Sequence, residues 1–468
     1  MKLSAKEKVS YGLGAVGKDM VYMLSAGYIL YYYQDVLGIN AIAMGIILMA
    51  ARVFDAFNDP IMGVIVAKTK TKWGKFRPWL LIGTLTNAVV LYFMYACPPD
   101  LSGSGLVAYA AITYILWGVT YTMMDIPYWS MIPAFTESGK EREGLTTLAR
   151  SCAGVGSAII TIFTMKLVYL LGQNNEVTGF KYLALIVAIL FVIFTIITCL
   201  NIKEKSTVDM ETAGVGQMFK ALVTNDQAMV VVISIVIVNL SVYITSNLVI
   251  YFFKYDFGGT SWYNSYTLFN MFGGAIQILS MMVFYPVLRK FMSNVKIFFT
   301  CMIGAIIGYV VLFAIAFTSM NNVYIFFIPG FFIFAANGVM QVLATVFLAN
   351  SVDYGDLKNG RRDESVIFSM QTFVVKLASG LAAFIASICL AVNNLQSGTE
   401  VSEADQVVDF SATVEASQRL GLRMTMTIVP IIGLIIAIIV FKKKFILTED
   451  KMVEIGEEIK ARDLAKES

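Results

Sequence analysis

Residues 52–60 read Arg-Val-Phe-Asp-Ala-Phe-Asn-Asp-Pro and place three charged side chains inside the apolar segment 41–67. A charged residue at bilayer depth costs about 2.5–3.5 kcal/mol on insertion scales, so three of them call for a functional reason. One face of a helix would carry the four polar side chains of this stretch: Arg52, Asp55, Asn58 and Asp59. Two carboxylates and an amide oxygen one turn apart are hard oxygen ligands suited to a small cation. The stretch therefore predicts a cation site on a membrane helix.

A second polar face lies in the apolar segment around Asp125. At about 100° per residue, an acid, an indole and two hydroxyls share one side of a helix there: Asp125, Trp129, Tyr121 and Thr122. Aromatic residues at helical spacing are more often packing than ligand, but an acid among them inside a membrane favours a binding site. Pro127 is expected to kink this helix and to free a backbone carbonyl just past the acid.

Other charges also fall inside apolar segments. Lys18 and Asp19 lie early in the first segment, where an adjacent pair of opposite sign could instead sit at the membrane interface. Lys376 lies about ten residues into the eleventh segment and needs a carboxylate partner or water. Ion pairs that hold a helix bundle together are the structural alternative, although apolar packing would do this with a smaller desolvation penalty. A water-accessible cavity for a polar solute and a cation accounts better for so many charges.

The side chains of this acid-rich set suit a sugar. Carboxylates accept hydrogen bonds from vicinal hydroxyls, Lys and Arg donate to the same oxygens, and an indole offers its face to the C–H side of a pyranose ring. Five residues supply those groups: Lys18, Asp19, Asp125, Trp129 and Arg150. An anionic solute would instead favour a net positive pocket.

Composition defines the class of protein. Of the 468 residues, 58% are hydrophobic and 14% charged, whereas soluble chains average about 25% charged residues. The chain is therefore expected to be an integral membrane protein, in contact with the bilayer and not with nucleic acid. The absence of histidine excludes His proton relays, His metal sites and Ser/His/Asp catalysis. We expect no catalytic residues, no cofactor and no enzymatic activity.

Apolar segments long enough to span a bilayer need about 17–25 residues. The sequence predicts twelve, at about 10–33, 41–67, 80–97, 106–134, 145–171, 182–201, 228–253, 263–288, 297–318, 323–350, 366–391 and 424–441. These define a six-helix half at 1–201, a central cytoplasmic loop at 202–227, a second six-helix half at 228–441 and a cytoplasmic tail at 442–468. The prediction is an all-α membrane protein of the major facilitator type, with its site between the halves.

The distribution of Lys and Arg predicts the orientation. The connections after the second, fourth, eighth and tenth segments are rich in Lys and Arg, and those after the first, third and ninth have none. Both termini are therefore expected in the cytoplasm of a cell whose plasma membrane the chain spans. Charge and location alone suggest a cytoplasmic gate formed by the loops of Lys75 and Arg77 and by a larger set: Arg142, Asp353, Asp356, Arg361, Arg362 and Glu364.

Five strings of this chain resemble the melibiose permease branch of the glycoside–pentoside–hexuronide:cation symporters, and the resemblance covers nearly the whole chain. The strings are Ser-Tyr-Gly at 10–12 with Gly-Lys-Asp at 17–19, Asp-Ala-Phe-Asn-Asp-Pro-Ile-Met-Gly at 55–63, Trp-Gly-Lys-Phe-Arg-Pro-Trp at 73–79, the stretch from Trp117 to Pro127, and Val-Asp-Tyr-Gly at 352–355. The resemblance implies a major facilitator fold and obligatory cotransport of a sugar with Na⁺, Li⁺ or H⁺.

The resemblance also assigns residues. It implies a cation site, for Na⁺ among others, at Asp55, Asn58, Asp59 and Thr122. It implies a galactoside site at Lys18, Asp19, Tyr121, Asp125, Trp129 and Arg150, with Gln371, Thr372 and Lys376 contributed by the second half. Where enteric melibiose permeases have a tyrosine and a tryptophan, this sequence has Ala26 and Gln341, so the aglycone preference stays open.

The expected function is import of a galactoside such as melibiose with a monovalent cation, by alternating access and as a monomer. Asp55 and Asp59 would repel one another until a cation neutralises them, and Arg52, one turn from Asp55, would pair with an acid in the empty site. Within the same family the substrate could instead be a glucuronide, a pentoside or an oligosaccharide. A lipid transporter of the same superfamily is a further alternative, and an intramembrane enzyme or receptor the least favoured one.

Overall fold

The computed structural model describes residues 3–136, 139–204, 215–318, 322–359, 364–395 and 409–467. Throughout these residues every regular element is a helix. This follows from the apolar composition, because a helix satisfies its own backbone hydrogen bonds where no water is available. The chain forms two compact units, the first comprising Met1–Thr212 with Leu390–Asp409 and the second Ala213–Cys389 with Phe410–Ser468.

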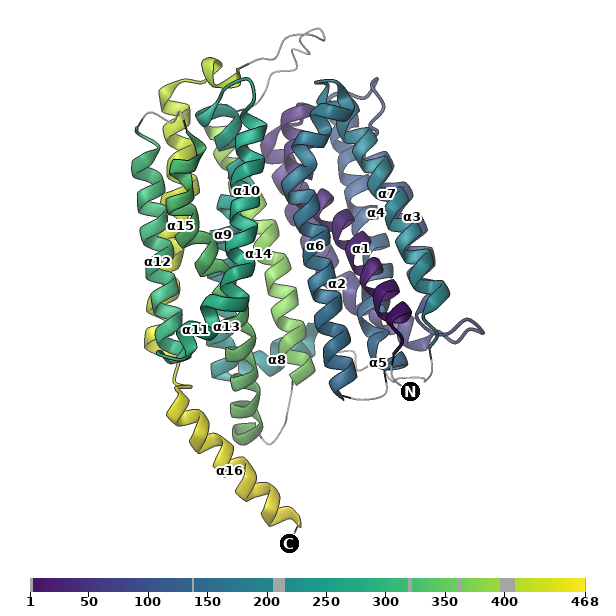
Figure 1. Cartoon of the computed structure of the whole chain (residues 1–468), viewed down its shortest axis with the longest axis vertical. Helices are drawn as coiled ribbons and strands as arrows, with labels where there is room; N and C mark the ends of the chain where they lie inside the picture. The colour runs from purple at the N-terminus through teal and green to yellow at the C-terminus, as the bar shows by residue number, and fades with distance from the viewer. Residues whose placement is uncertain are drawn as a thin grey trace. The chain divides into compact units, whose positions relative to one another are not determined.

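The first unit begins near the N-terminus (Figure 1) and has the following helices: α1 (Ala5–Tyr31) with a π-helical turn (Tyr32–Val36), α2 (Ala41–Lys68), α3 (Arg77–Tyr95), α4 (Gly103–Ser130), α5 (Ile132–Phe135), α6 (Gly139–Gly172) and α7 (Glu176–Asn201). Side-chain caps begin three of them: Ser4 accepts from the backbone of Glu7 at α1, Asn40 accepts from two amides at α2, and Asn175 accepts from the backbone of Thr178 at α7. Helix α1 packs on α6 and α7, α3 packs on α4 and α7, and α2 packs on α4.

The second unit has the following helices: α8 (Val215–Thr224), α9 (Asp226–Tyr251) with a π-helical turn (Phe252–Phe257), α10 (Trp262–Leu279), a π-helical turn (Ser280–Phe284), α11 (Tyr285–Arg289), α12 (Asn294–Ile315), a 3₁₀ turn (Val323–Phe326), α13 (Phe327–Asn359), α14 (Glu364–Val392), a 3₁₀ turn (Phe410–Thr413), α15 (Ala416–Lys444) and α16 (Glu449–Glu467). Helix α9 packs on α15 and α13, and α12 packs on α13 and α15. Helix α8 lies inside the segment that the sequence predicted as a central loop.

Eleven helices of the described chain are long and apolar enough to cross a membrane. Each lies at one of the twelve predicted spans, and the remaining predicted span lies in α1. Helix α1 has 27 residues and is long enough, but it begins with charged residues and carries Lys18 and Asp19 further along. Its polar side chains are tolerated because much of the helix is buried in the first unit.

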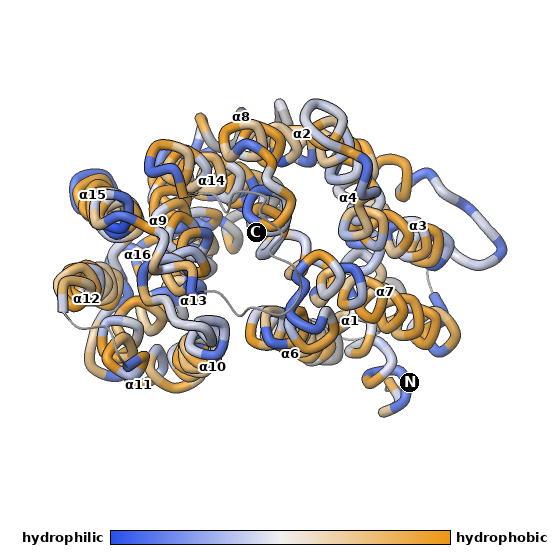
Figure 2. The backbone as a smooth tube through the Cα atoms, turned by 90° about the horizontal axis from the view of Figure 1, so that it is seen from above, coloured by the Kyte–Doolittle hydropathy of each residue, from blue (hydrophilic) through white to orange (hydrophobic). Residues whose placement is uncertain are grey.

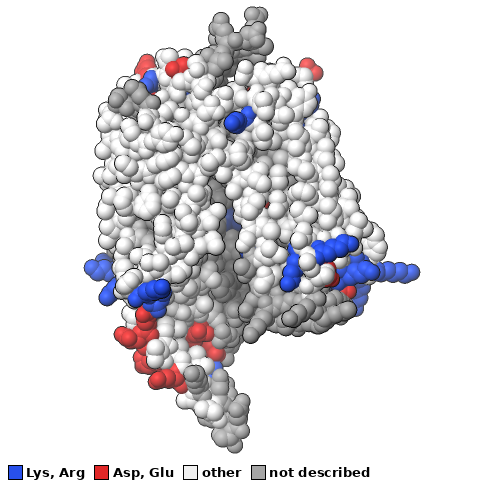
Figure 3. All heavy atoms as spheres, viewed as in Figure 1, with Lys and Arg blue, Asp and Glu red and all other residues white. Residues whose placement is uncertain are grey.

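The outer surface of each unit is apolar, as expected for contact with lipid. Exposed large hydrophobic side chains recur along the long helices of both units, and orange stretches dominate α7 of the first unit and α12 of the second in Figure 2. On the face shown in Figure 3, charged side chains are nearly absent from the middle of either unit, and most Lys and Arg gather toward one end. These features are those of a multi-pass membrane protein.

Candidate functional site

Lys18 is the centre of a polar cluster between α1 and α4 of the first unit. Its Nζ lies 2.8 Å from Oδ1 of Asp125 and 3.4 Å from Oδ1 of Asp19, and the lysine side chain is only 4% exposed. The same ammonium donates to the hydroxyl of Tyr121 over 3.3 Å. Asp125 keeps 30% of its side chain exposed. The buried Lys18 ammonium is thus held by α4, beside the partly exposed carboxylate of Asp125.

Trp129 extends this cluster toward α6. The Lys18 ammonium lies 5.1 Å from the centre of the indole, and the guanidinium carbon of Arg150 lies 4.0 Å from it. The ring of Tyr128 packs edge-on against Trp129 and stacks on Tyr11, whose carbonyl accepts a 2.7 Å hydrogen bond from the Tyr128 hydroxyl. The indole is therefore held by packing from one side and has two cations within cation–π distance.

The polar residues of α2 that the sequence predicts as a cation site form a second cluster in the same unit. This stripe on α2 consists of Arg52, Asp55, Asn58 and Asp59. Asp55 is buried, and one of its oxygens lies 3.5 Å from Nη1 of Arg52, so the pairing expected from their spacing is present. Asp59 accepts a 2.9 Å hydrogen bond from the hydroxyl of Thr122 on α4. The amide nitrogen of Asn58 is buried with no hydrogen-bond partner among the described residues. Carboxylate, amide and hydroxyl groups therefore meet where α2 faces α4.

Gly118 allows α4 to approach Asp55 closely. A Cβ at this position would lie 2.5 Å from Oδ1 of Asp55, which is closer than any real contact. One turn further along α4, Thr122 holds Asp59. Gly118 and Thr122 thus present one side of α4 to the acids of α2, while Tyr121 and Asp125 present another side to Lys18. A single helix contacts both clusters.

The structure brings together most of the residues predicted from the sequence. Lys18, Asp19, Tyr121, Asp125, Trp129 and Arg150 form one connected group, and Thr122 contacts Asp59 on the helix that also carries Asp55 and Asn58. Pro127 lies inside α4, three residues before its end.

The three residues predicted for the second half lie on α14. Gln371 and Lys376 are half-buried there and Thr372 is exposed, all within the second unit.

The predicted gate is only partly described. Asp356 on α13 is paired with Arg462 of the tail helix α16, with distances of 3.2 Å from Nη1 to Oδ1 and 3.0 Å from Nη2 to Oδ2. Asp353 is half-buried on the same helix. Arg462 was not among the expected partners, because the tail was read as a simple cytoplasmic extension. Lys75 and Arg77 are described: the backbone amides of both donate to Glu204, and the Arg77 guanidinium donates to the carbonyls of Cys199 and Ile202. The other members fall outside the described residues or side chains: Arg142, Arg361, Arg362 and Glu364.

Sequence reasoning missed a buried ion pair in the second unit. Asp256 accepts two hydrogen bonds of 2.6 Å from Arg423, and nearby Lys254 is buried with its ammonium 4.3 Å from the ring of Phe410. These charges lie just outside the predicted spans 228–253 and 424–441. The sequence holds one indication of this pair: opposite charges next to the ends of two spans that pack together in the fold. The periodicity of a single segment cannot reveal which spans pack together.

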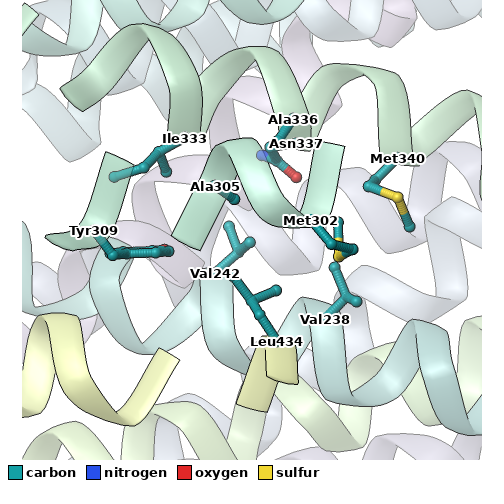
Figure 4. A pocket seen from close by; sticks show the side chains of 10 residues that line it. All are labelled: Val238, Val242, Met302, Ala305, Tyr309, Ile333, Ala336, Asn337, Met340 and Leu434. Atoms are coloured by element: carbon teal, nitrogen blue, oxygen red, sulfur yellow. The ribbon is translucent and has the colours of Figure 1, made fainter. Parts of the chain in front are cut away.

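A small pocket inside the second unit has a different character. It lies between α9, α12, α13 and α15, and Asn337 and Tyr309 are its polar members among residues such as Met302, Met340 and Leu434 (Figure 4). None of its ten lining residues carries a charge. It therefore lacks the carboxylates that distinguish the clusters of the first unit.

Comparisons with known proteins identify the class of this chain. Residues 10–445 match the family model described as MFS/sugar transport protein. The chain is 30% identical to the uncharacterized symporter YjmB of Bacillus subtilis (strain 168), over 98% of this chain and 96% of that protein. It is 27% identical to the raffinose carrier protein of Pediococcus pentosaceus, over 97% of this chain and 71% of that protein. It is 28% identical to the isoprimeverose transporter of Lactiplantibacillus pentosus, over 82% and 80%.

Solved structures agree on the fold. The xylose transporter XylE from E. coli, in a partially occluded inward open conformation, superposes with a TM-score of 0.59 at 12% identity over 95% of this chain and 98% of its own. A bacterial homologue of the human lysosomal transporter Spinster gives 0.67 at 12% identity over 93% and 95%. These identities establish the architecture alone. From the match of the family model over nearly its full length, the chain belongs to the family of MFS/sugar transport proteins, of the glycoside–pentoside–hexuronide:cation symporter type.

Proposed function

We propose that this protein is a secondary active symporter that imports a galactoside such as melibiose together with Na⁺, with Li⁺ and H⁺ as alternative coupling ions. The observation that carries the proposal is the double contact of α4. One side of this helix holds the Lys18 cluster through Tyr121 and Asp125, and another side touches the acids of α2 through Gly118 and Thr122. A change at one cluster can therefore reach the other within one rigid element.

The Lys18 cluster has the chemistry of a sugar site. Asp125 and Asp19 would accept hydrogen bonds from a vicinal pair of hydroxyls, while Lys18 and Arg150 would donate to the sugar oxygens. The face of Trp129 would pack on the C–H side of the ring. The Tyr121 hydroxyl accepts a hydrogen bond from the ammonium and helps to hold it in place. A sugar hydroxyl between Lys18 and Asp125 would replace part of their direct contact without leaving either charge unpaired.

The stripe on α2 has the chemistry of a site for a small cation. Asp55 and Asp59 would supply charge, and Asn58 and Thr122 would add neutral oxygens, as Na⁺ prefers. When a cation binds Asp55, it competes with Arg52 for the same carboxylate. H⁺ needs only one of the two acids, so the amide and the hydroxyl are the groups that would distinguish Na⁺ from H⁺.

Coupling follows by linkage. A cation that neutralises Asp55 and Asp59 would fix the contact between α2 and α4 and so the position of Tyr121 and Asp125. The factor by which a bound cation raises sugar affinity must equal the factor by which a bound sugar raises cation affinity. Gln371, Thr372 and Lys376 are proposed to complete the sugar site from the second half, and Asp353 and Asp356 to belong to the cytoplasmic gate. The protein would act as a monomer in the plasma membrane.

The identity of the sugar has competing candidates within the same class. Relatives are named for raffinose, lactose and isoprimeverose. Raffinose and lactose contain galactose, which favours a galactoside, whereas isoprimeverose contains xylose and keeps a pentoside open. A glucuronide also stays open, because the cations Lys18 and Arg150 balance the acids Asp19 and Asp125 in this cluster. A lipid substrate is disfavoured because the same charged cluster would have to be buried against acyl chains.

Uptake by the purified protein in proteoliposomes tests the proposal. Labelled methyl-α-galactoside, melibiose, raffinose, lactose, isoprimeverose and a β-glucuronide are compared under inward gradients of Na⁺, Li⁺ or H⁺. We expect accumulation of a galactoside that collapses when the cation gradient is removed. Galactoside uptake that is indifferent to all three cations would contradict the symporter function while leaving the fold intact.

A further inference from the structure

Tyr22 on α1 lies between the two clusters, although neither sequence motif includes it. It is one helical turn beyond Lys18, and its ring centre is 5.5 Å from that of Tyr121 and 6.2 Å from that of Trp117. On its other side, the guanidinium carbon of Arg52 lies 5.9 Å from the same ring. The half-buried ring of Tyr22 thus touches one partner of Asp55 and one partner of Lys18.

The contacts on either side of Tyr22 lead to the residues that would bind the cation and the sugar in the proposed symport. Tyr121 stacks on Trp117 at 5.2 Å and accepts the 3.3 Å hydrogen bond from Lys18, which pairs with Asp125. Arg52 lies 3.5 Å from Asp55, whose other oxygen occupies the space beside Gly118. A continuous path therefore runs from a cation ligand to a sugar ligand through the Tyr22 ring.

Asp55 and the ring of Tyr22 are both partners of Arg52, and a bound cation changes the balance between them. A cation on Asp55 weakens the hold of the carboxylate on the guanidinium, whose charge stays buried and needs another source of negative potential. The face of an aromatic ring attracts a guanidinium, and the attraction is stronger when the pair is desolvated. Arg52 would then move closer to Tyr22, and Tyr22 would press on the ring that holds Lys18.

We propose that Tyr22 is a positioning residue that transmits cation binding from Arg52 to the Lys18–Tyr121 contact. This inference rests on the proposed function, because it concerns how the cation and sugar sites communicate. It assigns Tyr22 no direct contact with either substrate. The physical basis is that Arg52 contacts both Asp55 and Tyr22, and that the ring of Tyr22 touches both clusters.

The test is the coupling factor, defined as the ratio of Na⁺ dissociation constants without and with saturating sugar. Calorimetry on the full-length protein measures it with melibiose, raffinose, lactose and isoprimeverose in turn. In the wild type we expect a factor in the usual range of about 5–150. Tyr22→Leu should bring this factor close to 1 while Na⁺ affinity in the absence of sugar changes less than about threefold. Tyr22→Phe should keep it, because the ring face and not the hydroxyl contacts Arg52.

Matched variants separate transmission from packing. Tyr92→Leu makes the same substitution on α3, where the ring packs on Phe93, and should leave the factor unchanged. Tyr22→Met provides a second aliphatic variant should Tyr22→Leu not fold. Arg52→Gln should lower the factor, and adding Tyr22→Leu to it should have no further effect. Full additivity of these two changes would overturn the proposed path.

Two further outcomes would be equally informative. An unchanged factor in Tyr22→Leu, or equal loss of sugar affinity with and without Na⁺, would overturn the role of Tyr22 and leave the symporter function standing. A wild-type protein in which none of the four sugars changes Na⁺ affinity would overturn the proposed function, and the role of Tyr22 with it.

Discussion

The two units of this protein bury ion pairs in different ways. In the second unit, Arg423 grips Asp256 with two bonds of 2.6 Å, and the carboxylate is 0% exposed. In the first unit, Arg52 lies 3.5 Å from Asp55. A short bidentate pair satisfies both oxygens and fixes the geometry, whereas a long contact is readily exchanged for another cation. We infer that the Arg423–Asp256 pair stabilises the fold and that the Arg52–Asp55 pair opens when a cation binds.

The same contrast separates the surroundings of the pairs. Lys18 contacts both Asp125 and Asp19, and Asp125 keeps 30% of its side chain exposed. Close by the Arg52 pair, the buried amide nitrogen of Asn58 has no hydrogen-bond partner among the described residues. Such groups cost stability if nothing ever binds them. Buried polar atoms without a hydrogen-bond partner among the described residues also occur in the second unit, at Thr267 and Asn270, so the contrast between the units rests on the two ion pairs. This contrast predicts where mutations affect transport and where they affect folding.

The largest expected effect is on stability in the second unit. Arg423→Ala leaves the carboxylate of Asp256 buried without its partner and should cost about 3–5 kcal/mol of unfolding free energy. Thermal unfolding followed by size-exclusion chromatography measures the loss. Arg52→Ala should be restored toward wild-type stability by added Na⁺, which can replace the guanidinium beside Asp55, while Arg423→Ala should not respond. Equal losses of unfolding free energy in both variants, unaffected by Na⁺, would contradict the distinction between the two pairs.

Asp125→Asn should lower transport with little effect on folding stability, because the buried Lys18 ammonium keeps its second carboxylate, Asp19, at 3.4 Å. Loss of a charged acceptor for the sugar hydroxyls should weaken sugar binding by about 2 kcal/mol, or roughly 30-fold. Binding of labelled sugar and the melting temperature are measured on the same preparation. Asp100→Asn, at an exposed turn of the same unit, is the matched control. Wild-type sugar affinity in Asp125→Asn would show that this carboxylate does not belong to a sugar site.

Gly118→Ala should act directly on the cation site. The new methyl group would collide with Oδ1 of Asp55 and displace the carboxylate, so Na⁺ affinity should fall by roughly tenfold, or about 1.4 kcal/mol. Calorimetry with Na⁺ measures this change. Gly105→Ala on the same helix has only an ordinary 3.6 Å contact and should behave as wild type. If both alanine variants bind Na⁺ like the wild type, the Asp55 carboxylate is not a ligand.

The smallest expected effect concerns ion selectivity. Asn58→Ala removes one neutral oxygen and should weaken Na⁺ binding by about 1 kcal/mol, or roughly fivefold. Uptake driven by an H⁺ gradient should be nearly unchanged, because protonation of Asp55 or Asp59 needs no amide. The two gradients serve as each other's control in one preparation. Equal loss of Na⁺-driven and H⁺-driven uptake would refute the assigned role of the amide.

The fold was largely predictable because charges are rare in this chain and most of them lie between its spans. Segment lengths identified the eleven apolar helices, and spacing alone indicated that Arg52 and Asp55 meet. Pairs between distant segments were not predictable. Asp256 and Arg423 are 167 positions apart, and the requirement for Gly118 exists only because α2 packs against α4. Such contacts depend on how helices pack, which the periodicity of a single helix does not contain.

Sugar-driven cation entry tests the central claim most directly. Proteoliposomes without any ion gradient or membrane potential receive an outside pulse of the transported sugar, and uptake of ²²Na⁺ or internal acidification is followed. The account predicts prompt cation entry with the wild type, and none with Asp59→Ala. Sugar entry by the wild type with no accompanying Na⁺ or H⁺ would contradict it, because the sugar would then cross the membrane uncoupled from the acids of α2.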